Sequence, residues 1–318
     1  MSRIRFGIQI EPQFGFDYQT VEQIALDAEK VGYDSIWSSD HFFLHDKAEE
    51  LNCMESWTLL AALASKTTKL RLGTLVTCNS YRYPAVLAKI AATVDMISNG
   101  RLEFGIGAGW KELEYKAYGI PFPSLRERMD RLEEALQIIK MLWTEPKSSF
   151  AGKYYVIKDA FSAPKPVQNL PLIFIGGTGE KRILRMVAQY GDYCNFGWFT
   201  PKDKVIHLLE ALKRHCEDVS RDYDSIGKSY FAYAMLADDE DRLEKLLASR
   251  AEERNISIEE FKKRMGATGA FVGTPEVIQQ EFQELIDLGF DYFQVMFPYP
   301  DDYRASQDFA QTIMKKLR

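Results

Sequence analysis

The residues with the clearest chemical potential follow short apolar runs, where a strand would end and a side chain could face a ligand. Asp40 and His41 come directly after one such run, at residues 35–38. A histidine in that place can act as an acid, a base or a hydrogen-bond donor near neutral pH. The alternative is a structural Asp–His pair that fixes a loop. His41, His45 and Asp46 could also chelate a metal, but no HExxH spacing and no third distant ligand supports this, so no metal site is predicted.

Two glycine-rich segments also follow apolar runs. Residues 105–109 read GIGAG, and residues 176–179 read GGTG before a predicted helix. Glycines leave backbone N–H groups accessible and a helix N-terminus attracts anions, so a phosphate site is favoured over a plain turn. Lys181 and Arg182 would lie in the first turn of that helix, where a bound phosphate or Glu180 would offset them. Neither segment completes a dinucleotide fingerprint or a P-loop.

Aromatic residues gather near the predicted strand ends and could form the walls of a pocket for a flat ligand. Core packing is the alternative for each of them. The residues concerned are Trp110, Trp198, Phe199, Phe297 and Tyr299.

The apolar pattern alternates between short β-rich runs and longer segments with helical spacing. Residues 126–143 carry the clearest helical stripe, and residues 275–288 follow Thr274 as N-cap with Pro275 at the first helical position. Several strand candidates are almost continuously apolar, which is typical of a parallel sheet covered on both faces. The predicted strands are residues 4–10, 35–38, 70–76, 102–106, 172–175, 193–196, 230–236 and 292–297.

Eight strand–helix units predict an α/β fold of the (β/α)8 TIM-barrel type, because each crossover returns right-handed to a parallel neighbour. A doubly wound open sheet is the alternative. No linker-like composition divides the chain, so residues 1–318 are expected to form a single domain with insertions after strands 4 and 7. The first insertion, residues 144–171, contains a hairpin-like stretch, and the second, residues 238–269, is highly charged and helical. Both are long enough to cover a site.

Composition excludes several classes of protein. The 318 residues include 40 basic and 46 acidic side chains, a formal net charge of −6, which argues against a nucleic-acid partner. The apolar content of 46% is too high for disorder, and no run of about 18 apolar residues would span a membrane. The N-terminus has no signal-peptide pattern. Four scattered cysteines without a CxxC motif favour a reducing, cytoplasmic setting.

Taken together, several segments resemble the bacterial-luciferase-like superfamily, and most closely its oxidoreductases that use the deazaflavin coenzyme F420. These segments are SIWSSDHF, LVTCNSYRYPAVLAKIAATVDMISNGRLEFGIGAGWKELEYKAYGIPFPSLRERMDRLEEALQIIKMLW, PLIFIGGTGEKRILRMVAQYGDYCNF and FVGTPEVIQQEFQELIDLGFDYFQVMF. The likeness covers nearly the whole chain and is weakest in the two insertions. It implies a luciferase-like barrel that holds a flavin-type ring at its mouth, and a homodimer.

The resemblance also implies roles for individual residues. A non-prolyl cis peptide after the third strand would back the ring, matched here to Thr74–Leu75 with Val76 and Thr77 beside it. Asp40 would contact the polar edge of the ring, and His41 would be the catalytic residue near the hydride-transfer centre. The cofactor phosphate would lie against two segments, made of Gly107, Ala108, Gly109 and Trp110, and of Gly176, Gly177, Thr178 and Gly179.

One position departs from the family pattern. The sugar-phosphate dehydrogenases carry a proton-transferring glutamate where this chain has Trp110, which puts that activity in doubt and leaves His41 as the matched acid or base. The leading hypothesis is an oxidoreductase that moves a hydride between F420 and a small organic substrate. The alternatives are an FMN-dependent monooxygenase fed by a separate flavin reductase, and a non-catalytic protein that binds a flavin or deazaflavin.

Overall fold

Eight parallel strands form a closed barrel in the computed structural model, which describes residues 3–197, 199–298 and 304–318. Each strand pairs in parallel with its two neighbours, and the last pairs with the first, so the ring has no open edge. The barrel prediction is confirmed and the open sheet is excluded. In ring order the strands are β1 (Arg5–Ile10), β2 (Ser35–Ser38), β3 (Arg71–Thr74), β5 (Leu102–Gly107), β8 (Leu172–Gly176), β9 (Tyr193–Gly197), β10 (Gly227–Leu236) and β12 (Tyr292–Met296).

The third strand is shorter than its apolar pattern predicts. It ends at Thr74, and β4 (Thr77–Cys78) then continues beside β5, with Thr77 opposite Ile106. The cis peptide bond in the intervening bulge joins Leu75 to Val76. The expected position, Thr74–Leu75, is therefore wrong by one residue, because the strand stops before the apolar run does.

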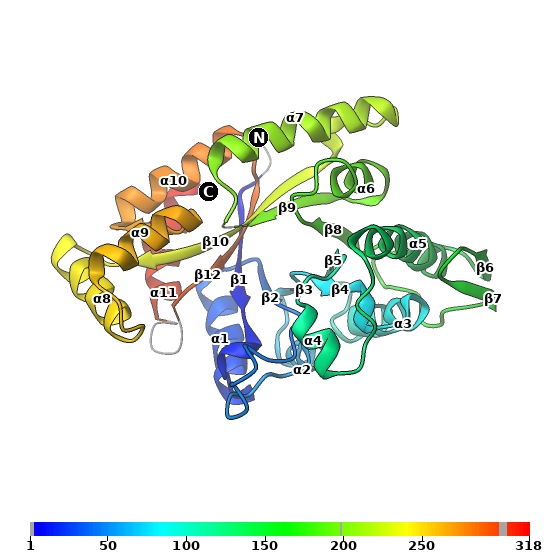
Figure 1. Cartoon of the computed structure of the whole chain (residues 1–318), viewed down its shortest axis with the longest axis horizontal. Helices are drawn as coiled ribbons and strands as arrows, with labels where there is room; N and C mark the ends of the chain where they lie inside the picture. The colour runs from blue at the N-terminus through cyan, green and yellow to red at the C-terminus, as the bar shows by residue number, and fades with distance from the viewer. Residues whose placement is uncertain (1–2, 198, 299–303) are drawn as a thin grey trace.

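Helices surround the barrel and bury their apolar faces against it (Figure 1). Asp17 caps α1 by accepting a hydrogen bond from the N–H of Thr20 at 2.7 Å, and Ser124 caps α5 in the same way through Glu127. The covering helices are α1 (Tyr18–Val31), α2 (Ser56–Lys66), α3 (Pro84–Ile97), α5 (Leu125–Thr144), α6 (Ile183–Tyr190), α7 (Lys202–Asp218), α10 (Pro275–Asp287) and α11 (Ala305–Phe309). No helix within the described ranges is both long and apolar enough to cross a membrane.

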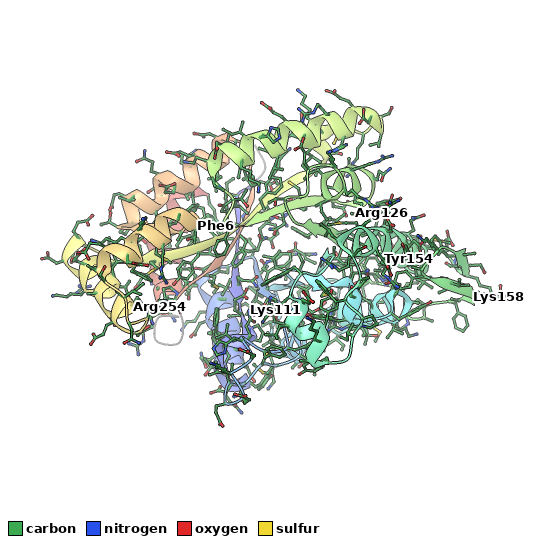
Figure 2. The ribbon with its side chains drawn as sticks, viewed as in Figure 1. Phe6, Lys111, Arg126, Tyr154, Lys158 and Arg254 are labelled. Carbon is green, nitrogen blue, oxygen red and sulfur yellow. The ribbon has the colours of Figure 1, made fainter. Side chains whose placement is uncertain are left out.

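The two insertions lie at opposite ends of the molecule in Figure 1. The first contains the expected hairpin, β6 (Ser148–Ala151) with β7 (Val156–Ala160), and Figure 2 shows Lys158 at its far tip. The second contains α8 (Glu240–Glu252) and α9 (Ile258–Thr268), which pack on each other, followed by β11 (Phe271–Gly273) against β10. Both predictions of local structure are confirmed.

The inside of the barrel is filled at the amino ends of the strands. Trp37 lies between β1 and β3, where a Cβ on Gly7 or Gly73 would come within 3 Å of its ring. Below it, Glu103 accepts hydrogen bonds from Tyr292 at 2.6 Å and from Arg71 at 2.8 Å. Because this packing closes one end, space for a ligand remains only toward the carboxyl ends of the strands.

Candidate active site at the carboxyl ends of the strands

A cavity of about 720 Å³ lies where sequence analysis expects a ligand. Every predicted site residue except Thr74 lines it. Thr74 is fully buried beneath it, where its hydroxyl donates to the carbonyl of Gly105 at 2.8 Å. The predicted residues that do line it are Asp40, His41, Leu75, Val76, Thr77, Gly107, Ala108, Gly109, Trp110, Gly176, Gly177, Thr178 and Gly179.

Glycines allow the bulge after β3 to approach the ends of β5 and β8. A Cβ on Gly107 would lie 2.8 Å from the side chain of Val76, and one on Gly176 would lie 2.9 Å from it. Gly177 has φ +130, a conformation that side chains rarely adopt. The bulge and both glycine segments therefore form one continuous wall, made largely of backbone.

The cations near the second glycine segment are placed differently from the prediction. Helix α6 begins only at Ile183, so Lys181 and Arg182 precede its first turn. The guanidinium of Arg182 pairs with Asp130 and with Glu133 on α5, which explains its presence without a ligand. These ion pairs also fix α5 beside the loop that follows β8.

Arg128 on α5 is a cation that the sequence analysis missed. It lines the cavity, is only 8% exposed, and has no carboxylate partner within the described part of the chain. One nitrogen donates to the carbonyl of Pro123 at 2.5 Å and the group lies over the ring of Phe122, but Nε has no hydrogen-bond partner. A buried guanidinium with an unused donor indicates an anionic ligand, because burying an unpaired charge is otherwise costly.

His41 is held by Glu114, which lies in the first turn of the short helix α4 (Glu112–Ala117). The ring Nδ1 lies 3.0 Å from a carboxylate oxygen of Glu114, which is completely buried. Burial alone would raise the pKa of Glu114, but bonds from His41, Tyr81 and the N–H of Phe42 hold it at about 2. An ionised carboxylate only accepts hydrogen bonds, so Nδ1 carries the proton of this contact. Nε2 is then the ring nitrogen left for a ligand.

Asp40 is bound more firmly to protein than the prediction implies. Its carboxylate forms a two-pronged pair with Arg82, at 2.7 and 2.9 Å, and accepts from the N–H of Cys78 at 3.0 Å. Arg82 is in turn bonded to Glu55. Asp40 reaches the cavity wall, and its main contacts brace the loop that carries β4.

Glu11 is an acidic residue that lines the cavity and was not predicted. It follows β1 directly, and its carboxylate accepts hydrogen bonds from Gln9 at 2.7 Å and from Gln13 at 2.5 Å. Burial raises its pKa, although these bonds and the charge of His41 act in the opposite direction. It forms no ion pair with any described residue. Of the predicted aromatic residues, Trp110 and Phe199 line the cavity, Phe297 is buried, and Trp198 and Tyr299 lie outside the described residues.

Some of these omissions have a recognisable signal. Glu11 stands at the end of the first predicted strand, the same position that drew notice to Asp40 at the end of the second. Arg128 lies four residues before Leu132 on the buried stripe of α5, where a charged residue is unexpected. Glu114 has no comparable signal, because only the folded chain brings it to His41.

Comparisons with known proteins show the family and the fold. The family model described as luciferase-like monooxygenase matches residues 4–292. An F420-dependent glucose-6-phosphate dehydrogenase of Kineococcus radiotolerans is 30% identical over 325 residues, covering 92% of this chain and 91% of the relative. One of Amycolatopsis mediterranei is 28% identical, covering 95% and 96%. The structure of a coenzyme F420-dependent tetrahydromethanopterin reductase from Methanopyrus kandleri superposes with a TM-score of 0.80, at 19% identity and full coverage of both chains.

Proposed function

Because the chain belongs to the luciferase-like monooxygenase family, we propose that it is an oxidoreductase that transfers a hydride between coenzyme F420 and a small organic substrate. The observation that carries the proposal is the unpaired guanidinium of Arg128 beside glycine-lined loops, in the same cavity as His41. The relatives that match over most of their length are named as F420-dependent dehydrogenases.

The described residues fit such a cofactor. The amide of Gly179 and the side chain of Arg128 would hold its phosphate, since exposed backbone N–H groups and a cation both favour an anion, whereas the N–H of Gly177 donates to the carbonyl of Asn195 at 3.2 Å. The bulge at Leu75–Val76 would back its ring. When bound, F420 supplies the carbon centre that accepts or gives up the hydride.

The protein's own groups would orient the reactants and move the accompanying proton. His41 presents Nε2 to the cavity, and Glu114 holds the ring through Nδ1, so a substrate hydroxyl or carbonyl could exchange a proton with it. The ring of Trp110 meets that of His41 edge to face, with centroids 5.7 Å apart. This contact and the bond to Glu114 restrict the ring from two sides.

The proposal includes a homodimer and a cytoplasmic location, with residues 1–318 acting as one domain. Exposed apolar side chains near the start of α3 and on β7, among them Val86 and Val156, offer a surface that a second copy could cover. All four cysteines are free thiols, which suits a reducing compartment. Light scattering after size-exclusion chromatography tests the dimer.

Titration of the purified protein with F420 and with FMN tests the choice of cofactor, since both have a flat ring and a phosphate. We expect micromolar F420 binding with negligible FMN binding, followed through the fluorescence of each ligand. FMN binding without F420 binding would overturn the proposal in favour of a flavin-dependent monooxygenase. Replacement of His41 by Ala should leave F420 affinity within about twofold and abolish turnover; unchanged turnover would remove His41 from proton transfer.

A further inference from the structure

The loop between β8 and α6, residues 177–182, carries the glycine segment that would hold the cofactor phosphate. Gly177 and Gly179 have no side chains that could pack against a neighbour, and glycine is the residue with the largest conformational freedom. An anion site needs amides that keep one direction, because a loop that becomes ordered only on binding loses affinity through the cost of ordering. Contacts from outside the segment therefore have to set the direction of these amides.

Backbone contacts hold the glycine segment at both ends. At its start, the N–H of Gly177 donates to the carbonyl of Asn195 on β9 at 3.2 Å. At its end, the carbonyl of Gly179 accepts from the N–H of Ile183, the first residue of α6, at 2.9 Å. The N–H of Gly179 donates to no acceptor among the described residues, so it remains available to a ligand.

His215 on α7 binds the backbone of the same loop directly. Its Nε2 lies 2.9 Å from the carbonyl oxygen of Glu180, and because that oxygen can only accept, Nε2 carries the proton. Only 20% of the His215 side chain is exposed. Since α6 already holds the carbonyl of Gly179, this contact fixes a second planar peptide group in succession directly after the Gly179 amide.

Side-chain contacts to Glu180 support the same arrangement more weakly. Its carboxylate lies 3.1 Å from Nε2 of His207 and 3.5 Å from a guanidinium nitrogen of Arg214. His207 lies two turns before Arg214 and His215 on one face of α7, which runs beside α6 (Figure 1). Both His207 and Arg214 are 56% exposed, and ion pairs between exposed groups contribute little. The bond from His215 is therefore the main tie between α7 and the loop.

A surface cavity of about 370 Å³ lies between the loop and α7 at this point. Apart from Ala211, the side chains that line it are polar or charged, Lys181 among them. No large apolar side chain belongs to this lining, so apolar packing does not hold the loop on this side. Hydrogen bonds across the space have to do so.

We propose that His215 is a positioning residue for cofactor binding, because its hydrogen bond to the carbonyl of Glu180 keeps the Gly179 amide turned toward the phosphate. This inference rests on the proposed function, since it takes the phosphate to lie at the glycine segment. His215 does not line the cavity of the candidate active site and so acts through the loop. Its removal should weaken ligands that carry a phosphate and leave a phosphate-free ring unaffected.

Two ligands that differ only in the phosphate test this role. One is the deazaflavin alcohol, which is F420 cut back to its ring and ribityl chain, and the other is the phosphate ester of that alcohol. Dissociation constants are measured by ligand fluorescence for the wild type and for His215→Leu, which keeps an apolar body but has no donor. We expect the phosphate ester to bind about three- to tenfold more weakly to the variant, as for loss of one hydrogen bond, and the alcohol to change less than about twofold.

Two further variants give the rescue and the matched control. His215→Gln should restore most of the affinity for the phosphate ester, since its side-chain amide can donate to the same carbonyl. His207→Leu should change this affinity less than about twofold, because His207 contacts the carboxylate of Glu180 and not its carbonyl. Equal losses in His207→Leu and His215→Leu, or equal losses for both ligands, would overturn the inference. Unchanged affinity of His215→Leu for the phosphate ester would do the same.

NMR relaxation of isotopically labelled glycine nitrogens, on the protein without ligand, separates this inference from the proposed function. In the wild type the Gly179 amide should be as rigid as that of Gly105 in β5, with an order parameter of about 0.85, and in His215→Leu it should fall below about 0.6. An order parameter that stays the same in the variant would overturn the inference. Failure of the wild type to bind F420 would instead refute the proposed function, and the relaxation measurement would still decide whether His215 orders the loop.

Discussion

Replacing Arg128 by methionine distinguishes a role of this residue in cofactor binding from a role in the stability of the fold. Methionine keeps most of the length and apolar volume of the side chain and removes its charge and donors. Arg128 is 8% exposed, has no carboxylate partner within the described residues, and leaves Nε without a hydrogen bond. The substitution therefore removes a buried charge that protein atoms only partly satisfy.

The expected effects on stability and on affinity differ in size. Loss of the bond to Pro123 and of the contact with the ring of Phe122 costs about 1–2 kcal/mol. Relief from desolvating an unpaired cation offsets this, so the free energy of unfolding without ligand should stay within about 1 kcal/mol. A charge-assisted hydrogen bond to phosphate contributes about 1.5–3 kcal/mol, so F420 affinity should fall about ten- to a hundredfold.

Urea unfolding and fluorescence titration of F420 measure the two effects separately. Arg126→Met is the matched control, since Arg126 is exposed on the same turn of α5 (Figure 2) and should change both quantities little. The affinity of the Arg128→Met protein should also depend less on salt concentration, because one ionic contact is gone. Unchanged F420 affinity would refute the phosphate assignment, and a loss of several kcal/mol in stability would show that Arg128 serves the fold.

Three further outcomes follow from the packing and charges of the site. Glu114→Gln should lower the free energy of unfolding by about 3 kcal/mol in urea at pH 7, since Lys111 and His41 lose a buried anion. Glu127→Gln, which removes only a partly exposed pair with Arg131, should cost under about 0.5 kcal/mol, and equal losses would contradict the assignment. Glu114 and Glu29 both have a pKa of about 2, against 4.5 in the unfolded chain, so their stabilisation is complete above about pH 5 and is lost as pH falls toward 2. A urea midpoint that stays constant from pH 6 to pH 3 would contradict this. Gly109→Ala places a Cβ 2.0 Å from the hydroxyl oxygen of Tyr115 and should lower the free energy of unfolding by more than about 2 kcal/mol. Gly119→Ala, also at positive φ but with open space around it, should lower it by about 1 kcal/mol. Equal melting temperatures of the two variants would refute the clash.

The fold was predictable because its signals are local. Each barrel strand is a short apolar run bounded by turn residues, and the number of strand–helix units favours a closed barrel over an open sheet. The error at β3 has the same origin. Its apolar run continues to Val76, but the backbone leaves the strand at Thr74, since the bulge packs against glycines of β5 and β8. Those contacts join segments about 30 and 100 residues away, and no local pattern contains them.

The candidate site also contains residues that the sequence predicts and residues that only the folded chain identifies. Residues at strand ends, such as His41 and Gly177, follow from the rule that barrel ligands bind there. Glu114 could not be assigned, because it lies 73 positions from His41 and its partners come from three separate segments. The placement of Glu11 across the mouth from the glycine segment after β8 also needs the strand order, which puts β1 opposite β8.

The two halves of the mouth differ in whether backbone or side chains form the wall. This difference would allow the substrate preference to change while cofactor binding is kept. On the β5 and β8 side, the wall is largely backbone, and a side chain added at Gly107 or Gly176 would come within 3 Å of Val76 in the bulge. On the β1 side, the wall includes the side chain of Phe14, on the segment that follows β1, and a substitution there alters charge or size without moving a strand. A single cation at Phe14 should therefore shift ligand preference while F420 affinity stays within about twofold. If Phe14→Lys changed the ligand preference and also weakened F420 binding, the two halves of the mouth would not be independent.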